Sequence, residues 1–135
     1  MYGIFVNEDG GIHYAQAIVE GRKPIETRSK AMLRQLVGER VAVIRTRRGK
    51  SPMVLGYVDI VGDAHRNGKW MDENRNLTLI PPGSKYDANG WAKWCYFLSN
   101  PEKCEPYPLP ADAVRHGRSW CEFDAEKKYC ADGIF

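Results

Sequence analysis

Three charged residues, Lys23, Glu26 and Arg28, stand close together in the first quarter of the chain. Lysine and arginine donate hydrogen bonds to phosphates or base carbonyls, and a carboxylate accepts from an exocyclic amine, so the set can distinguish one nucleobase edge from another. The same set suits hydrolysis if burial and the nearby arginine lower the pKa of Lys23 while Glu26 activates water. A third interpretation is structural, with Glu26 and Arg28 forming an ion pair that closes a cleft.

The sequence before these residues predicts a short helix that ends near Glu20. Gly21 follows where a left-handed helix cap is expected, and Pro24 prevents the helix from resuming. The chain is therefore expected to leave the helix in an extended conformation. The apolar positions of the helix have the spacing of an amphipathic helix: Ile12, Ala15, Ile18 and Val19.

An extended chain sets the directions of the charged side chains. Alternate residues share a face, so Glu26 and Arg28 point one way, whereas Ile25 and Thr27 point the other. Lys23 has the wrong parity to join the first pair on a straight strand. It reaches them only if the bend at the helix exit turns it toward them.

The rest of the chain predicts several strands. Runs of β-branched and aromatic residues bounded by turn residues are typical of strands, and Gly56 inside one run suggests a bend or a close backbone approach. A weak helical pattern covers 29–36, a basic hairpin loop covers 47–52, and one helical turn is expected at 111–114. The predicted strands are 4–6, 41–45, 53–61, 77–80, 94–98 and 120–123.

The order of these elements predicts an α+β fold, a small mixed barrel with helices at one end. The connection 63–90 is mostly polar and is expected to be functional, because long connections inside a compact domain are seldom idle. Within it, 81–87 offers hydroxyl, ammonium and phenol groups. The strand 94–98 is expected to end at 99–101, where a proline stands.

Composition indicates one globular domain. The 135 residues are 43% hydrophobic and 27% charged, and a chain of this length buries roughly two-thirds of its unfolded surface. No apolar run approaches the ~18 residues of a membrane span, and the N-terminus has no basic region ahead of a long apolar stretch. A cytoplasmic protein with no membrane partner is therefore expected.

Positive charge is concentrated in one part of the sequence. Residues 22–50 contain ten Lys or Arg against Glu26 and Glu39, whereas the whole chain has a net charge of +3. Such a basic stripe is the usual electrostatic footprint of a protein with phosphate-bearing partners. It is also compatible with a solvated loop and strand edge.

The cysteine pattern does not predict a zinc ribbon, because close Cys pairs are missing. Without a secretory signal, reduced thiols are expected, with a metal site and disulfides as the alternatives. His13 and His65 have no partner at metal-ligand spacing, so neither a metal ion nor another cofactor is expected. Gaps of eight, sixteen and eight residues separate the four cysteines: Cys95, Cys104, Cys121 and Cys130.

The charged residues belong to a stretch that resembles the GxKxxExR signature of the ASCH domain, a branch of the PUA-like fold: Gly21, Lys23, Glu26 and Arg28. The flanks 38–43 and 117–120 are also similar to the family. The resemblance covers 1–124 as one domain, with 125–135 as a tail that belongs to the same domain or frays. It implies a small mixed PUA-like β-barrel of about five to six strands, with short helices flanking a cleft that holds the charged residues.

The resemblance also implies a function in nucleic-acid chemistry. Members of the family are proposed to bind RNA or modified nucleotides, and a few hydrolyse acetylated cytidine or RNA. In the amidohydrolase branch the motif lysine acts with a threonine three residues later, a position that Glu26 holds here. In the ribonuclease branch a lysine and a late serine are implicated, and Ser119 lies in a suitable late position. Because a carboxylate cannot replace a hydroxyl nucleophile, the sequence favours binding over turnover.

A charged cleft that binds single-stranded RNA or a nucleotide or nucleoside ligand is therefore expected. The alternative is a small metal-free hydrolase in which Lys23 and Glu26 are catalytic. Aromatic residues near the cleft are expected to stack on a base, a contact worth about 1–3 kcal/mol. The expected ligand-binding residues are Lys23, Glu26, Arg28, Ser84, Lys85, Tyr86, Trp94, His116, Arg118 and Ser119.

Overall fold

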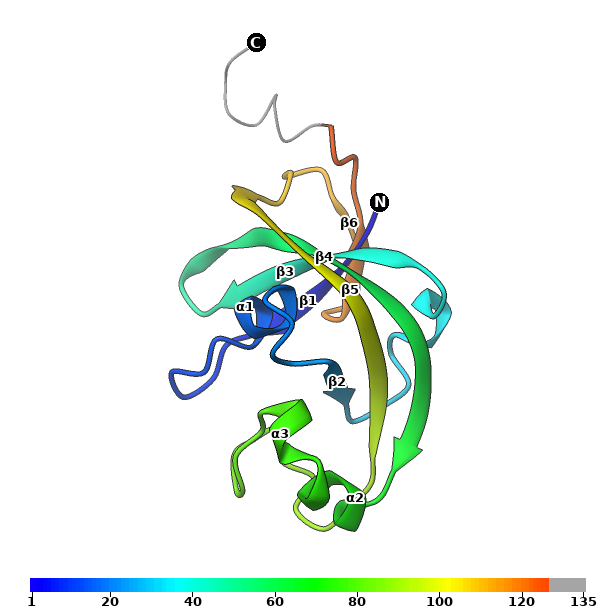
Figure 1. Cartoon of the computed structure of the whole chain (residues 1–135). Coiled ribbons are helices and arrows are strands. Elements are labelled where there is room, and N and C mark those ends of the chain that lie inside the picture. Colours follow the sequence, from blue (N-terminus) through cyan, green and yellow to red (C-terminus); the bar gives the residue numbers. More distant parts are fainter. Residues whose placement is uncertain (127–135) are drawn as a thin grey trace.

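The computed structural model describes residues 1–126, which form one mixed, curled sheet with short helices beside it (Figure 1). The sheet has seven strands in the order β2-β5-β4-β3-β1-β7-β6. In chain order, the elements are β1 (Tyr2–Asn7), α1 (Tyr14–Val19), β2 (Ile25–Arg28), the 3-10 helix η1 (Arg34–Leu36), β3 (Arg40–Arg47), β4 (Lys50–Arg66), α2 (Gly68–Glu73), α3 (Arg75–Thr78), β5 (Lys93–Pro108), β6 (Val114–His116) and β7 (Trp120–Glu122).

One pair of neighbouring strands is parallel, and this pair determines where the charged residues lie. β1 runs parallel to β3, with Ile4 opposite Val43, whereas the other neighbouring strands are antiparallel. A tight turn cannot join two parallel strands, so the chain crosses from β1 to β3 through α1, β2 and η1. The crossover passes in front of the sheet in Figure 1.

The sheet is not closed into a barrel and has seven strands, so the expected barrel of five to six strands is only partly right. Its two edge strands are short: β2 has four residues and β6 has three. Within residues 1–126, β2 pairs only with β5 and β6 only with β7, so no ladder joins the two edges. Strands this short offer too few backbone groups to complete a hydrogen-bonded ring.

β4 and β5 are much longer than predicted, with 17 and 16 residues. The prediction ends the strand near Pro101 because proline cannot donate a ladder hydrogen bond. In the structure Pro101 and Pro106 fall where the register shifts, between paired positions, so no ladder bond is lost. Gly56 lies beside the shift at Pro106, and a Cβ there would be 2.1 Å from the carbonyl oxygen of Glu102. The predicted close backbone approach at Gly56 is confirmed.

Residues 77–80 contain the end of a helix instead of the predicted strand. α3 ends at Thr78 and is capped by Leu79, whose φ of 61° is left-handed. Thr78 is fully buried and Ile80 is 4% exposed, so this run is apolar because it packs on the core. A short apolar run has no periodicity that separates a strand from one buried helical turn.

Two segments predicted to be helical are mostly not helical. In 29–36 only the 3-10 turn η1 forms. At 111–114 the chain turns and then enters β6 at Val114. Each pattern contains only two or three apolar residues, too few to stabilise a helix without tertiary contacts.

The main core fills the space between α1 and the sheet, where Ile18 packs with Val43 and Tyr96. Cys95 and Cys121 are thiols buried in strands, as the reduced-thiol interpretation expects, and burial raises the pKa of each to about 11. Cys104 is a half-buried thiol. Cys130 and the tail residues 127–135 lie outside the described residues.

None of the helices in residues 1–126 is long and apolar enough to cross a membrane. Over the same residues, no three His, Cys, Asp or Glu side chains are grouped in a way that could hold a metal ion.

Candidate functional site

The end of α1 directs the chain into the site. Gly21 has a φ of +81°, its N–H donates to the carbonyl of Ile18 at 3.0 Å, and the N–H of Arg22 donates to Ala17 at 2.9 Å. These two bonds form a Schellman motif, which confirms the predicted glycine cap. The N–H of Lys23 also reaches the carbonyl of Ala17, at 3.1 Å, so the chain turns back beneath the helix before Pro24. Because of this turn, Lys23 points toward Glu26, although alternation along a straight strand would point it away.

Lys23 is 1% exposed. Its Nζ donates to the backbone carbonyl of Thr78, lies 3.6 Å from Oε1 of Glu26 and is 5.1 Å from the centre of the Tyr14 ring. Burial lowers the pKa of Lys23, and the negative charge of Glu26 opposes the decrease. The ammonium is thus held between a carbonyl, a carboxylate and an aromatic face.

Glu26 is 7% exposed and both of its carboxylate oxygens are engaged. Oε1 accepts from the backbone N–H of Thr27 at 3.1 Å, and Oε2 accepts from Nη2 of Arg28, also at 3.1 Å. Burial alone raises the pKa of Glu26, but the positive charges of Arg28 and Lys23 outweigh burial and hold the pKa below 4.5. Glu26 is therefore an ionised acceptor placed between two cations.

Arg28 connects the edge strand β2 to β1 across the seam, which is the gap where the sheet fails to close. Its Nη2 donates to the backbone carbonyl of Phe5 on β1 at 2.6 Å, as well as to Glu26 on its own strand. The β7 ladder along β1 runs only to Ile4, opposite Trp120, so the Phe5 carbonyl lies just past its end. A guanidinium here supplies the hydrogen bond that a neighbouring strand would otherwise give.

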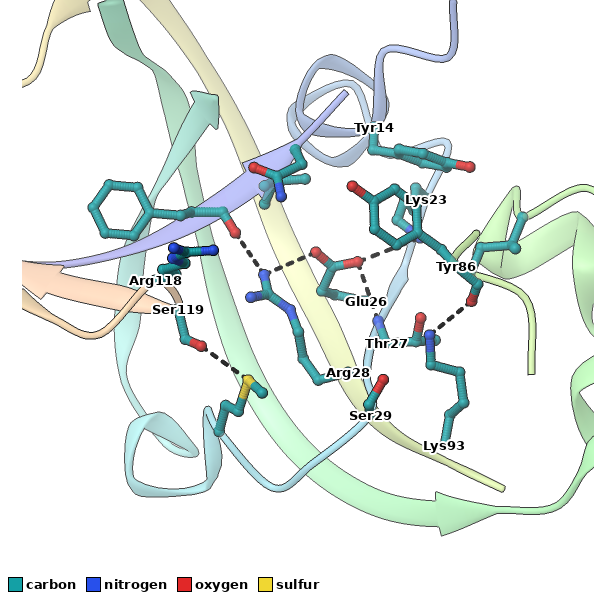
Figure 2. A pocket seen from close by; sticks show the side chains of 15 residues that line it. Tyr14, Lys23, Glu26, Thr27, Arg28, Ser29, Tyr86, Lys93, Arg118 and Ser119 are labelled. Atoms are coloured by element: carbon teal, nitrogen blue, oxygen red, sulfur yellow. Dashed lines mark hydrogen bonds and ion pairs between the residues drawn. The ribbon is translucent and has the colours of Figure 1, made fainter. Parts of the chain in front are cut away.

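A cavity of about 240 Å³ opens at this seam, and Figure 2 shows the side chains around it. It is about the size of one nucleoside, below the roughly 300–1,000 Å³ of typical drug-sized pockets. Residues from α1, β1, β2, β5 and four connecting segments line it: Phe5, Val6, Asn7, Tyr14, Lys23, Glu26, Thr27, Arg28, Ser29, Met32, Ile80, Tyr86, Lys93, Arg118 and Ser119.

Two tyrosines contribute unused hydrogen-bonding groups to the cavity. The hydroxyls of Tyr14 and Tyr86 are buried without a hydrogen-bond partner among the described residues. The two rings meet edge to face with their centres 6.0 Å apart. Burial raises the pKa of Tyr14 to about 12, so its hydroxyl stays protonated and available as a donor.

Six of the ten expected binding residues line the cavity: Lys23, Glu26, Arg28, Tyr86, Arg118 and Ser119. Figure 2 shows that the Tyr86 ring reaches across from its loop toward Glu26. Ser119 lies on the opposite side, where its hydroxyl donates to the sulfur of Met32 at 2.9 Å.

The other four expected residues lie outside the cavity lining. Trp94 already stacks on His65, with ring centres 4.6 Å apart, and the guanidinium of Arg34 lies 5.9 Å from its ring. Stacking on a base would have to compete with these contacts. Lys85 is exposed and lies 4.0 Å from Asp9, while the buried hydroxyl of Ser84 has no partner within the described chain.

His116 is also outside the lining because local partners hold it elsewhere. Its ring stacks on Trp120 with centres 4.0 Å apart, and Nε2 lies 2.9 Å from Oε2 of Glu122. These contacts link β6 to β7 at the edge of the sheet.

Two residues that line the cavity, Tyr14 and Lys93, were not predicted from the sequence, and Thr27 was predicted to face away from the site. Tyr14 begins the buried face of α1, and a phenol in an apolar helix stripe is a signal that a sequence can carry. Lys93 has the same strand parity as the buried Cys95, so it is a charged residue at an inward position. Thr27 lines the cavity despite its parity, since its backbone N–H faces Glu26.

The basic stripe is divided among ion pairs. Arg22 pairs with Glu20, Arg40 with Asp59 and Glu102, and Arg47 with Glu8. Much of the local excess seen in the sequence is therefore offset by acids that come from elsewhere in the chain.

Comparison with solved structures shows the fold. Three crystal structures of an ASCH protein from Zymomonas mobilis, two of them point mutants, match with TM-scores of 0.69, 0.68 and 0.69 at 16% sequence identity. Each match covers 98% of this chain, and 95%, 97% and 94% of the other chain. No family model matches the sequence, and no curated protein matches it. The chain therefore has an ASCH-domain fold.

Proposed function

On the premise of an ASCH-domain fold, we propose that this protein binds one nucleoside or nucleotide in the cavity at the seam, with Lys23, Glu26 and Arg28 as the recognition residues. Free nucleotides and single unstacked nucleotides of an RNA both fit this description. Recognition of single-stranded RNA commonly works through individual exposed bases, so a site for one nucleotide is sufficient.

One observation carries the proposal: buried polar groups with unused hydrogen bonds line a partly open cavity. The hydroxyls of Tyr14 and Tyr86 have no partner in residues 1–126. A buried polar group without a partner costs free energy, and natural proteins rarely leave such groups unpaired. A polar ligand in the cavity satisfies both hydroxyls.

The recognition residues supply donors and an acceptor side by side. Lys23 and Arg28 donate, and Glu26 is an ionised acceptor. A nucleobase edge combines acceptors with an exocyclic donor, which matches this arrangement. The interlocked ion pairs hold these groups in place before the ligand arrives, which lowers the entropic cost of binding.

The test is a titration of the protein against short single-stranded RNAs by fluorescence anisotropy and against a nucleoside and nucleotide panel by calorimetry. Lys23→Ala is expected to abolish binding. Arg22→Ala is the matched control, because Arg22 is exposed, pairs only with Glu20 among the described acids and lies one residue away. Flat titrations across both panels with the unchanged protein would refute the proposal.

A hydrolase is the second candidate, and the position of Thr27 favours it. Thr27 lines the cavity near Glu26 and Lys23, so a hydroxyl-bearing residue is present although Glu26 holds the family's threonine position. In this alternative Lys23 and Glu26 are catalytic and the substrate is an N-acylated nucleoside or RNA.

Turnover is measured by incubating concentrated protein with N-acetylated cytidine or RNA and separating the products by chromatography. Under the hydrolase alternative, Glu26→Gln abolishes product formation. Substrate that remains intact after long incubation with the unchanged protein removes this alternative and leaves the binding proposal standing.

A further inference from the structure

The cavity carries more positive than negative charge. Four cationic side chains line it, Lys23, Arg28, Lys93 and Arg118, against one carboxylate, Glu26. Buried charges in proteins are normally paired, because an unpaired charge in a low-dielectric interior is costly. Glu26 already pairs with Lys23 and Arg28. Lys93 and Arg118 have no such partner among the described residues, and of the two only Lys93 is buried.

Lys93 shows the imbalance most clearly. It is 7% exposed, and its Nζ donates to the backbone carbonyl of Tyr86 at 2.7 Å. No carboxylate of residues 1–126 lies within ion-pair distance of its Nζ. The nearby Asp87 is committed to Arg75, 3.1 Å away, and to the backbone N–H of Gly83 at 2.7 Å. Burial lowers the pKa of Lys93, and an anion bound beside it would raise the pKa again.

Arg118 adds a second cation at the opposite side of the cavity. It is exposed, and in the described part of the chain its guanidinium has neither an ion pair nor a hydrogen bond. Figure 2 shows Arg118 across the cavity from Lys93, with Glu26 and Arg28 between them. An anion approaching the cavity therefore meets positive charge on both sides.

Most neutral polar groups of the cavity are also able to donate. The hydroxyls of Tyr14 and Tyr86 are donors without a partner in residues 1–126, and Ser29 also lines the cavity. Among the described residues Glu26 is the one carboxylate in the lining, and each of its oxygens already accepts one hydrogen bond. The cavity thus suits a ligand that is rich in acceptors and negatively charged. A phosphate group meets this description, with roughly two negative charges at neutral pH and three acceptor oxygens.

Resting on the function proposed above, we infer that the ligand of this cavity is a nucleoside monophosphate and that Lys93 binds its phosphate. A neutral nucleoside would leave Lys93 without a counter-charge. The volume of about 240 Å³ suits a ligand the size of a single nucleotide.

The experiment is isothermal titration calorimetry with matched ligands: a nucleoside, its 5′-monophosphate and inorganic phosphate. The monophosphate is expected to bind roughly tenfold to a hundredfold more tightly than the nucleoside, the range of one charge-assisted hydrogen bond. Lys93→Met is expected to remove this preference. Lys93→Arg keeps the charge and is expected to keep most of the preference.

Lys85→Met is the matched control, because Lys85 is an exposed lysine on the neighbouring loop that does not line the cavity. It is expected to change neither affinity. Thermal denaturation of each variant verifies folding, so a loss of preference in a folded Lys93→Met protein reports the phosphate contact.

The outcomes separate this inference from the function it rests on. Equal affinities for nucleoside and monophosphate would overturn the inference and leave the proposed function intact. An undiminished preference in Lys93→Met would overturn the role of Lys93. Inorganic phosphate binding as tightly as the monophosphate would overturn the nucleotide assignment. No binding of any nucleoside or nucleotide would overturn the proposed function itself.

Discussion

Two ion clusters in this protein use similar residues in opposite settings. The cavity cluster consists of Lys23, Glu26 and Arg28, whose side chains are 1%, 10% and 14% exposed. The surface cluster consists of Arg40, Asp59 and Glu102, at 37%, 31% and 61%, and links β3, β4 and β5. Their closest hydrogen bonds are comparable, at 3.1 Å in the cavity cluster and 2.8 Å on the surface.

The contrast shows that charge imbalance is informative only where water is excluded. The surface cluster has two acids for one base, and solvent screens the difference. The cavity cluster has two bases for one acid, and Lys93 lines the same cavity. The low exposure of these side chains weakens screening by solvent. The same inequality is ordinary on the surface, whereas in the interior it supports the anionic ligand inferred above.

The strongest test of this comparison removes one acid from each cluster. Glu26→Ala is expected to lower the free energy of unfolding by about 3–5 kcal/mol, because Lys23 and Arg28 are left as buried cations without a counter-charge. Glu102→Ala is expected to cost less than about 1 kcal/mol. Urea denaturation measures both. Similar losses in the two variants would show that burial does not distinguish the clusters.

The next largest expected effect is a loss of folding stability as the pH falls. The pKa of Glu26 is held below its ordinary value of 4.5 in the folded protein. Its pairing therefore contributes fully above pH 4.5 and is lost as the pH falls from there through the lower folded pKa, because the unfolded chain takes up the proton first. Urea denaturation over this range is expected to show a shallower decline for Glu26→Gln than for the unchanged protein. Glu39→Gln, at an exposed carboxyl without an ion pair in the described chain, is the control and is expected to leave the slope unchanged.

Salt dependence gives a smaller effect, on the surface side of the comparison. Arg40→Ala is expected to destabilise the protein by less than about 1 kcal/mol at low salt, and by less still in 1 M salt, where the screening length is roughly 3 Å. Thermal denaturation at the two salt concentrations measures the change. If Arg40→Ala lowers stability equally at both salt concentrations, Arg40 behaves like the buried residues of the cavity cluster, and the comparison fails for this residue.

The smallest expected change in folding stability is at the hydroxyl of Tyr86, which has no hydrogen-bond partner among the described residues. Tyr86→Phe removes a hydroxyl that bonds to nothing in residues 1–126, so stability in the absence of ligand is expected to stay the same while ligand affinity falls. Tyr57→Phe is the matched control, because its hydroxyl bonds to that of Tyr107 at 2.7 Å and its loss is expected to cost about 0.5–1.5 kcal/mol. Equal stability losses, measured by urea denaturation, would contradict the assignment of the Tyr86 hydroxyl to a ligand.

The parts of the site that follow from local rules could be predicted from the sequence. Gly21 predicts the helix cap, and alternation along the extended step puts Glu26 and Arg28 on one face, as the structure has them. These rules act within a few residues. The same holds for the first and last strands, which form close to their predicted ranges.

The missing parts depend on contacts between distant residues. Lys93 joins the cavity because β5 pairs with β2, and Trp94 leaves it because its ring finds His65 on β4. The strand prediction at 77–80 failed for the same reason, since Thr78 is held in a helical turn that offers its carbonyl to Lys23. The open sheet could not be foreseen either, because closure depends on how many backbone groups the edge strands retain.

The crossover between the parallel strands β1 and β3 has a consequence for how this fold can diversify. Tyr14, Lys23, Glu26 and Arg28 all come from this one connection, while the paired residues of β1 and β3 lie outside it. Glu26 and Arg28 also belong to β2, which pairs with β5, and Arg28 donates to the carbonyl of Phe5 on β1. The same short segment therefore supplies the charged groups of the cavity and ties the edge of the sheet to its centre, so substitutions at Glu26 or Arg28 change the cavity and the sheet together.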